Sequence, residues 1–312
     1  MEYQRRRSRS LLLDVCILLL LPWVVIAQKK TPAIFIFGDS LSDAGNNNYI
    51  RTLSKADSPP NGMDFPGGYA TGRYTNGRTT VDIIGQLAGL KDFLPPYLAP
   101  NATGSLILNG LNYASGAGGI LNSSGYILPL SPIGNFTSSQ VASLLVRIYH
   151  GQLTRLYNMG ARKVVVASVG PLGCIPFQLT FRLSKNGECS AKVNAQAKEF
   201  NAGVFAMVKQ LNAELAAAKF IYADAYKGVL EIIQNPAAYG FKVVNEGCCG
   251  AGDSYKGVIP CSSIVRLCPN RFEYLFWDPY HPTDKANVVL STKFFSGTAY
   301  TWPMNIEQLL MS

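Results

Sequence analysis

The sequence is poor in histidine and in charge, and it has no internal repeat. Its 312 residues include two histidines, and 15% of positions are charged while 48% are apolar. No tract combines low hydrophobicity with high charge as disordered chains do, so we predict a globular domain with a core of ordinary size. After the first 27 residues, no apolar run is long enough to span a membrane.

Residues 1–27 have the layout of a secretory signal peptide. Four arginines precede an apolar run over residues 11–26, and a small residue follows at Ala27, where cleavage is expected. A transmembrane anchor is the alternative, but Asp14 and Pro22 interrupt a run that is already short for a bilayer. We therefore predict a secreted, extracellular protein in the cell wall space, with no transmembrane anchor after cleavage.

The predicted mature chain is basic. Cleavage would remove four arginines and two acidic residues, so the formal net charge falls from +9 to +7. A basic surface favours association with acidic cell-wall polymers or with anionic membrane surfaces. A solvated basic face without a partner is the alternative. Nucleic acid is not an expected partner of an exported chain.

Six cysteines remain after cleavage, an even number in an oxidising compartment, and three disulfides are predicted. The six are Cys174, Cys189, Cys248, Cys249, Cys261 and Cys268. Their grouping suggests one bridge between the first two and two bridges within residues 248–268. A zinc site in the second group is the competing interpretation, but neither histidines nor paired C-x-x-C spacing accompany it.

Three asparagines begin N-x-S/T sequons and are predicted glycosylation sites on exposed loops. They are Asn101, Asn122 and Asn135.

Strand-like and helix-like segments alternate along the chain, which predicts an α/β fold with a mainly parallel sheet. Strands are expected near 33–37, 111–113, 163–169 and 220–223, and helices near 79–90, 138–159, 190–218 and 283–295. In such sheets the site lies at the carboxyl ends of the strands, and both Ser40 and Gly116 fall at such ends.

A serine hydroxyl becomes a nucleophile when a base takes its proton and a carboxylate orients the base. Of the two histidines, His281 follows Asp278 by three residues in a proline-bounded loop, which suits a catalytic base. His150 falls inside an amphipathic segment, which suits a packing or surface role. Ser40 stands in a tight turn after the first predicted strand.

Five stretches resemble the signature blocks of plant GDSL esterases, within the SGNH hydrolase group, and they occur in the family's order. They are Phe37 to Asn48, Asn112 to Ile120, Val169 to Pro176, Cys248 to Gly250, and Trp277 to Pro282.

The resemblance implies a flavodoxin-like, three-layer hydrolase domain over residues 28–312 that cleaves carboxylic esters of lipid, acylated cell-wall or cutin type. It implies that Ser40 attacks the ester carbonyl, that His281 accepts the serine proton, and that Asp278 orients the imidazole. The oxyanion would be held by the backbone N–H groups of Ser40 and Gly116 and, in the family, by an asparagine side chain; Gly118 is a less suitable alternative glycine. Neither a metal nor an organic cofactor is required.

Two further features of the first block have structural interpretations. Asp39 is expected to stabilise the turn before the nucleophile and not to act as the relay acid. The residues from Gly45 to Asn48 are expected to shape the loop after it.

The family's third block, a strand that ends in G-x-N-D, is missing between about residues 121 and 128. The sheet is therefore expected to be short of one internal strand and helix beside the nucleophile strand. Either the strand at 163–169 pairs with 33–37 instead, or both strands have unpaired edges. The alternative function is accordingly a shortened, catalytically impaired isoform that acts as a non-catalytic secreted binding protein or does not fold stably.

Overall fold

A computed structural model describes residues 33–124, 136–182, 186–252 and 254–312. The predicted signal peptide lies outside these residues, which belong to one unit, Pro32–Ser312. Among the described residues, no helix has both the length and the apolar character needed to cross a bilayer.

Strands and helices alternate along the chain, as the sequence predicts. The strands are β1 (Ile34–Ile36), β2 (Gly110–Asn112), β3 (Lys163–Ala167), β4 (Lys219–Ala223), β5 (Val243–Gly247), β6 (Tyr274–Phe276) and β7 (Thr301–Trp302). The α-helices are α2 (Thr80–Leu87), α3 (Ser138–Asn158), α4 (Pro176–Phe181), α5 (Ala191–Glu214), α6 (Ala225–Gln234), α7 (Asp284–Phe295) and α8 (Ile306–Met311). Each predicted segment is therefore confirmed, within a few residues at its ends.

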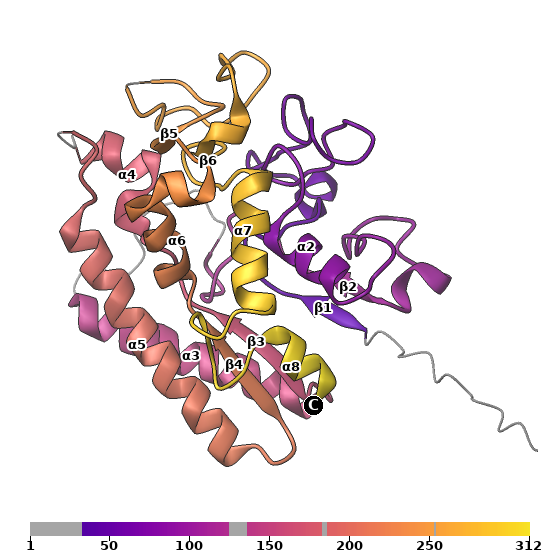
Figure 1. The fold of residues 1–312 in the computed structure, drawn as a ribbon. Coiled ribbons are helices and arrows are strands. Elements are labelled where there is room, and N and C mark those ends of the chain that lie inside the picture. The colour runs from indigo at the N-terminus through magenta and orange to yellow at the C-terminus, as the bar shows by residue number, and fades with distance from the viewer. Residues whose placement is uncertain (1–32, 125–135, 183–185, 253) are drawn as a thin grey trace, which may run out of the picture. The chain divides into compact units, whose positions relative to one another are not determined.

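The strands form three small sheets. β1 pairs with β2, β3 with β4, and β5 with β6, each pair in parallel, while β7 joins β4 antiparallel. Figure 1 shows β3 and β4 near the lower centre of the molecule, with β1 and β2 to their right. The predicted mainly parallel pairing is confirmed, but the described residues do not form one continuous sheet.

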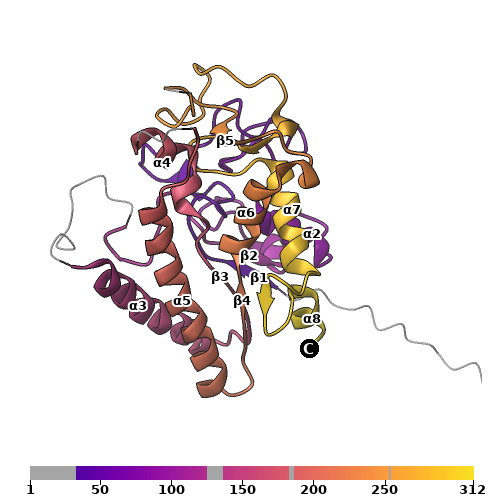
Figure 2. The same cartoon turned by 60° about the vertical axis from the view of Figure 1, so that its left-hand side comes forward.

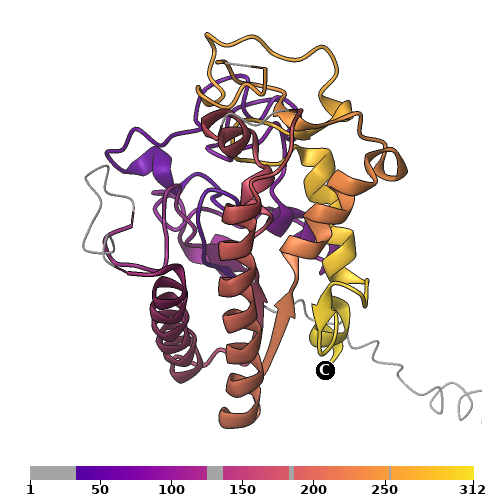
Figure 3. The ribbon, with the colours of Figure 1, turned by 90° about the vertical axis from the view of Figure 1, so that its left-hand side faces the viewer.

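Helices cover both faces of β4, so this part of the fold has three layers. Phe220 and Tyr222 pack into a core cluster with α3 and α5, whereas Ile221 and Ala223 pack into a second cluster with α6, α7 and α8. This alternation follows from the two-residue period of a strand. Figures 2 and 3 show α3 and α5 together on one side of the strands, and α7 and α8 on the other.

Helix starts follow local sequence rules. Thr137 and Thr79 form capping boxes with the third residues of α3 and α2, Gln140 and Asp82. In each box the threonine oxygen accepts the backbone N–H of the third residue, and that residue's side chain accepts the N–H of the threonine. Thr283 caps α7 through the N–H of Ala286. These contacts explain why the helix boundaries could be predicted from sequence.

β1 and β3 are among the strands that have an edge with no partner strand in the described part of the chain. β1 pairs only with β2, and β3 pairs only with β4. Phe35 of β1 is 54% exposed and Val165 of β3 is 41% exposed, whereas Phe220 in the covered strand β4 is fully buried. Of the two arrangements predicted for a missing strand, the described residues show unpaired edges, not direct pairing of β1 with β3.

All six cysteines of the mature chain are in disulfides, which bridge Cys174 to Cys189, Cys248 to Cys268, and Cys249 to Cys261. The last two surround the fully buried Trp277. A disulfide sulfur has no thiolate charge with which to bind zinc, so the structure does not support the zinc interpretation.

Two of the three sequon asparagines fall in the described part of the chain. Asn101 and Asn122 are both exposed. Asn135 lies outside the described residues.

A buried ion pair holds the loop after Ser40 in place. Arg73 donates from Nε and Nη2 to the carboxylate of Asp82, at 2.7 and 2.8 Å, and from Nη1 to the carbonyl of Ala44 at 3.2 Å. Burial alone would raise the pKa of Asp82, but the charge and hydrogen bonds of Arg73 outweigh it and lower that pKa below its usual value.

We expect Arg73→Met to lower the free energy of unfolding by about 3–5 kcal/mol, because it leaves the carboxylate of Asp82 buried without its partner. Urea denaturation at pH 7 measures this loss. The control is Arg78→Met, which breaks the more exposed pair with Asp284 and should cost about 1 kcal/mol or less. Equal losses in the two variants would contradict the importance of the buried pair.

A second charged cluster joins α6, α7 and the C-terminal segment. Tyr239 and Tyr300 both donate their hydroxyls to Glu231, and Lys293 Nζ lies 3.3 Å from the same carboxylate. The two tyrosine hydrogen bonds lower the pKa of Glu231 to about 2.

This depressed pKa predicts a pH-dependent contribution to stability. The contribution should be complete above the unfolded value of 4.5 and should be lost as the pH falls towards 2, since the unfolded chain then binds the proton first. Thermal unfolding at pH 7 and pH 3 should therefore show Glu231→Gln to be less stable than the parent at pH 7, with a smaller difference at pH 3. The control is Glu199→Gln, at an exposed position. Its difference in stability from the parent should not shrink between pH 7 and pH 3.

Candidate active site

Ser40 lies in the turn that follows β1. Asp39 accepts the N–H of Leu41 on Oδ1 at 2.9 Å, and its carbonyl accepts the N–H of Ser42 at 3.1 Å. The predicted turn role of Asp39 is thus confirmed. This tight turn leaves the side chain of Ser40 partly exposed at the carboxyl end of the strand.

Asp278 and His281 lie in the loop between β6 and α7. The loop is closed by Trp277, whose N–H donates to the carbonyl of His281 at 2.7 Å. Asp278 Oδ1 accepts the backbone N–H of His281 at 2.8 Å, so the carboxylate faces the imidazole three residues ahead. Both side chains are buried.

The disulfide region supports this loop from one side. The N–H of Cys248 donates to the carbonyl of Phe276 at 3.0 Å, and the N–H of Cys249 donates to that of Trp277 at 2.6 Å. A Cβ on Gly247 would lie 3.1 Å from the carbonyl carbon of Asp278, so the two backbones approach closely. The two bridges within residues 248–268 therefore lie directly beside the loop that holds Asp278.

The three side chains are hydrogen bonded in series. His281 Nε2 lies 2.7 Å from Ser40 Oγ, and His281 Nδ1 lies 2.8 Å from both carboxylate oxygens of Asp278. Because an ionised carboxylate only accepts hydrogen bonds, Nδ1 donates and Nε2 is the nitrogen that can accept the serine proton. The geometry brings together a serine, a histidine and an aspartate from segments 241 residues apart, in the arrangement that a nucleophile, a base and an orienting acid require.

Tyr74 packs against the imidazole. Its ring centroid lies 5.0 Å from that of His281, and its hydroxyl donates to the carbonyl of Ser54. Burial raises the pKa of Tyr74 to about 12, so the phenol is neutral near pH 7. Tyr74 therefore fixes one face of the imidazole without adding charge to it.

Gly116 makes a hydrogen bond that the sequence did not predict. Its N–H donates to Asp43 Oδ2 at 2.8 Å, and its carbonyl accepts from Asn47 Nδ2 at 2.9 Å. The N–H of Gly118 donates to the carbonyl of Ser115 at 2.9 Å. By contrast, the N–H of Ser40 has no acceptor in the described part of the chain.

Comparison with known proteins bears on this arrangement. The sequence profile of the family described as "GDSL-like Lipase/Acylhydrolase" matches residues 124–294, more than half of the chain. The protein "GDSL esterase/lipase At4g16230" of Arabidopsis thaliana is 40% identical over 343 aligned positions, which cover 92% of this chain and 93% of that protein. This chain belongs to the GDSL lipase and acylhydrolase family.

Other Arabidopsis thaliana proteins support the same membership. "GDSL esterase/lipase At1g33811" is 39% identical, with 90% of this chain and 92% of that protein covered. "GDSL esterase/lipase At1g71691" is 40% identical, with 89% of this chain and 85% of that protein covered. The GDSL family is one of carboxylic ester hydrolases with an α/β fold, in agreement with the layers seen here.

Asp43 is a residue of this GDSL-family site that sequence reasoning did not single out. It is fully buried, and its carboxylate accepts the N–H groups of Gly45, Asn46 and Gly116 at 2.7, 2.7 and 2.8 Å. Burial raises its pKa, although these N–H groups oppose the rise. The hydrogen bond between Asp43 and Gly116 joins residues 73 positions apart, so no local pattern predicts it. The one signal in the sequence is that Asp43 follows Ser40 by three residues.

The asparagines after the nucleophile shape the loop, as predicted. Asn46 Nδ2 donates to the carbonyls of Asn112 and Ala114, and Asn47 Oδ1 accepts from Ser115 Oγ. These bonds join the turn after β1 to the turn after β2. The two turns that supply Ser40 and Gly116 therefore form one hydrogen-bonded body.

His150 lies apart from the site. It belongs to α3, and its Nε2 is 3.4 Å from Glu214 Oε2 at the end of α5. It thus has the packing role that the sequence suggested. Within the described residues, no three His, Cys, Asp or Glu side chains are placed to hold a metal ion.

Proposed function

We propose that this chain is a secreted serine hydrolase in which Ser40 attacks an ester carbonyl, His281 takes the serine proton, and Asp278 orients the imidazole. The observation that supports this most directly is the continuous hydrogen-bonded series from Asp278 through His281 to Ser40. A non-catalytic role has less support, because a binding protein has no need of this alignment of nucleophile, base and acid.

The reaction follows from the protonation states of these groups. As Ser40 Oγ bonds to the ester carbonyl carbon, its proton moves to His281 Nε2, and the imidazolium that forms is stabilised by the carboxylate of Asp278. The proton then passes to the leaving alcohol when the tetrahedral intermediate collapses to an acyl-enzyme. Water, deprotonated by the same imidazole, releases the acid and restores Ser40.

The proposed oxyanion hole contains the N–H groups of Ser40 and Gly116. Ser40 N–H has no acceptor among the described residues, so it is available to a developing oxyanion. Gly116 N–H would have to be shared with Asp43 or released by it. The first donor therefore has stronger support than the second.

We also propose that the chain is a shortened family member that lacks one internal strand-helix unit. The alignment with the first relative extends over 343 positions, more than the 312 residues of this chain, so it must open gaps here. The unpaired edges of β1 and β3 in the described region agree with the loss of a strand between them. Such a loss would remove the family's third oxyanion donor and weaken, without abolishing, catalysis.

The proposed substrates are acyl esters of lipids, of acylated cell-wall sugars or of cutin-type monomers, and the proposed location is extracellular. Three disulfides suit an oxidising compartment. The names of these relatives, esterase/lipase, support ester substrates in general.

Labelling by a fluorophosphonate probe tests the proposed nucleophile, because the probe reacts with an activated serine. We expect the purified protein to be labelled once and Ser40→Ala not to be labelled. Hydrolysis of a short-chain p-nitrophenyl ester should fall to the background rate in the same variant. Ser42→Ala, two residues away, is the matched control and should keep labelling. Equal labelling of the parent and Ser40→Ala would reject the assignment.

A further inference from the structure

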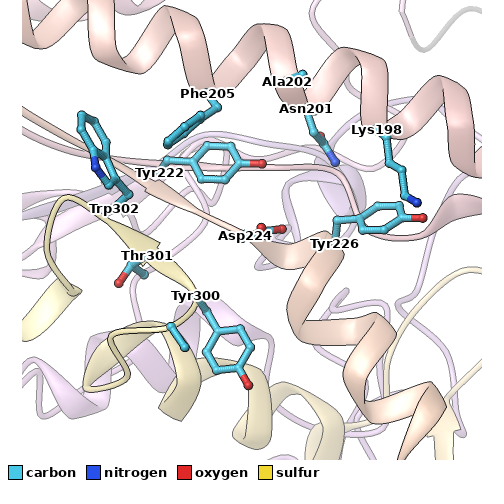
Figure 4. Close-up of a pocket in the computed structure, with 11 residues that line it drawn as sticks. Lys198, Asn201, Ala202, Phe205, Tyr222, Asp224, Tyr226, Tyr300, Thr301 and Trp302 are labelled. Carbon is cyan, nitrogen blue, oxygen red and sulfur yellow. The ribbon is translucent and has the colours of Figure 1, made fainter.

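A pocket distant in sequence from the catalytic segments lies between α5, the end of β4, and the segment before β7 (Figure 4). Its volume is about 370 Å³. Neither Ser40, Asp278 nor His281 lines it. The lining side chains include five aromatic residues, which are Phe205, Tyr222, Tyr226, Tyr300 and Trp302.

Three of these rings form one packed aromatic wall. Phe205 lies edge-on to Trp302, with ring centroids 5.4 Å apart, and edge-on to Tyr222, with centroids 5.1 Å apart. Trp302 remains 36% exposed, so part of its ring faces solvent. An exposed aromatic face with a packed back offers a rigid apolar platform on which a flat ligand can stack.

Besides Lys293, which lies over Tyr300 and is paired with Glu231, three lysines lie over the rings of this pocket. Lys209 Nζ is 4.2 Å from the centroid of Phe205, Lys198 Nζ is 5.5 Å from that of Tyr226, and Lys227 Nζ is 5.3 Å from that of Tyr300. All three are exposed, and none forms an ion pair with a carboxylate in the described part of the chain. Lys198 lines the pocket itself, while Lys209 and Lys227 lie beside its rings, so positive charge surrounds a pocket whose lining includes one carboxylate, that of Asp224.

Two polar side chains inside the pocket are held in place by hydrogen bonds to the backbone. Asn201 donates from Nδ2 to the carbonyl of Val169 and accepts the N–H of Val169 on Oδ1. Asp224 accepts the N–H of Lys227 on Oδ1 at the start of α6 and points between Tyr222 and Tyr226 in Figure 4. Asp224 Oδ2 has no donor among the described residues and can accept a hydroxyl.

We infer that this pocket binds an acidic oligosaccharide built of uronic acid residues. A uronate combines an apolar ring face for the aromatic wall, hydroxyls for Asp224, and one carboxylate per sugar for the lysines. A neutral sugar would leave the lysines without a partner, and a bare phosphate would leave the rings unused. The site gives a physical basis to the cell-wall association predicted from the basic net charge, and it depends on the proposed function only for the extracellular location.

The test is binding of an oligogalacturonate of four to six residues, measured by calorimetry. The protein used carries Ser40→Ala, so that no ester chemistry contributes. We expect the free-acid oligomer to bind at least tenfold more tightly than its fully methyl-esterified form at 50 mM salt, with the difference shrinking at 500 mM as the charges are screened. Failure of the free-acid oligomer to bind, or equal binding of both forms, would overturn the inference. Tighter binding of inorganic phosphate or anionic lipid vesicles than of the oligomer would also overturn it.

Variants separate the two parts of the pocket. Trp302→Ala removes the stacking face and should weaken oligomer binding about tenfold. Lys198→Gln should weaken it about two- to fivefold and reduce the salt dependence, with the rings intact. Phe181→Ala and Lys192→Gln alter an exposed aromatic residue and an exposed lysine outside the pocket, and should leave binding unchanged. Losses of the same size in these controls would show non-specific attraction only.

The same variants keep this inference separate from the proposed hydrolase function. Trp302→Ala and Lys198→Gln in the otherwise unaltered protein should hydrolyse a short-chain p-nitrophenyl ester at the parental rate. If the ester is not hydrolysed but the oligomer binds as described, the proposed nucleophile fails and the pocket assignment stands.

Discussion

Asp278→Asn is expected to lower kcat for a short-chain p-nitrophenyl ester about 10⁴-fold. The carboxylate of Asp278 accepts from His281 Nδ1 through both oxygens, which keeps the proton on that nitrogen and leaves Nε2 free to accept from Ser40. An amide in its place presents N–H groups that favour the other tautomer, in which Nε2 carries the proton and cannot act as the base. Steady-state kinetics measure the effect, and KM should change little.

The control for this substitution is Asp39→Asn, which alters the carboxylate directly before Ser40 in the chain. Asparagine can also accept the N–H of Leu41 in the turn, so kcat should change only a few-fold. Both variants should unfold within a few degrees of the parent. A similar loss of kcat in the two variants would contradict the assignment of Asp278 as the orienting acid.

Inserting the strand-helix unit that we propose this chain lacks is expected to raise kcat about 10²- to 10³-fold. The change is a chimera that carries, between Gly119 and Ser138, the corresponding longer segment of the Arabidopsis relative At4g16230. If the proposed loss is correct, the graft supplies a strand between β1 and β3 and returns the third oxyanion donor. It should also raise the free energy of unfolding, because exposed apolar side chains such as Phe35 and Val165 become covered.

A second chimera separates catalysis from folding. It carries the same segment with the asparagine that the family resemblance places in the third block, G-x-N-D, changed to alanine. This chimera should keep the gain in stability, measured by urea denaturation, and lose most of the gain in kcat. No change in stability or kcat in either chimera would show that the shortened-sheet interpretation is wrong.

Much of the fold could be predicted because its signals are local. The strand-like segment before Ser40, the threonine caps of α2, α3 and α7, and the apolar stripes of the helices all depend on residues within a few positions of one another. The proximity of Asp278 to His281 is local for the same reason, since three residues in a turn place both side chains together.

Other parts of the fold had no such signal. β5 and β6 were not predicted, because β6 is three residues long and β5 contains Asn245 and Glu246, which obscure a strand pattern. Their parallel pairing depends on segments far apart in the chain. The hydrogen bond between Asp43 and Gly116 is equally non-local, so the role of this carboxylate emerged only in the folded structure.

The sequence alone determined the turn that holds Ser40, the family, and the residue types available for chemistry, because each depends on short motifs in which neighbours along the chain act together. Only the tertiary structure decided that His281 lies 2.7 Å from Ser40, that Asp43 holds the amide of Gly116, and that β1 and β3 keep unpaired edges among the described residues. It also gathered the aromatic rings and lysines of α5, α6 and the β7 region around one pocket. The physical reason is the same in each case: these contacts join segments tens to hundreds of residues apart, and packing of the layers, not local preference, brings them within hydrogen-bonding or van der Waals distance.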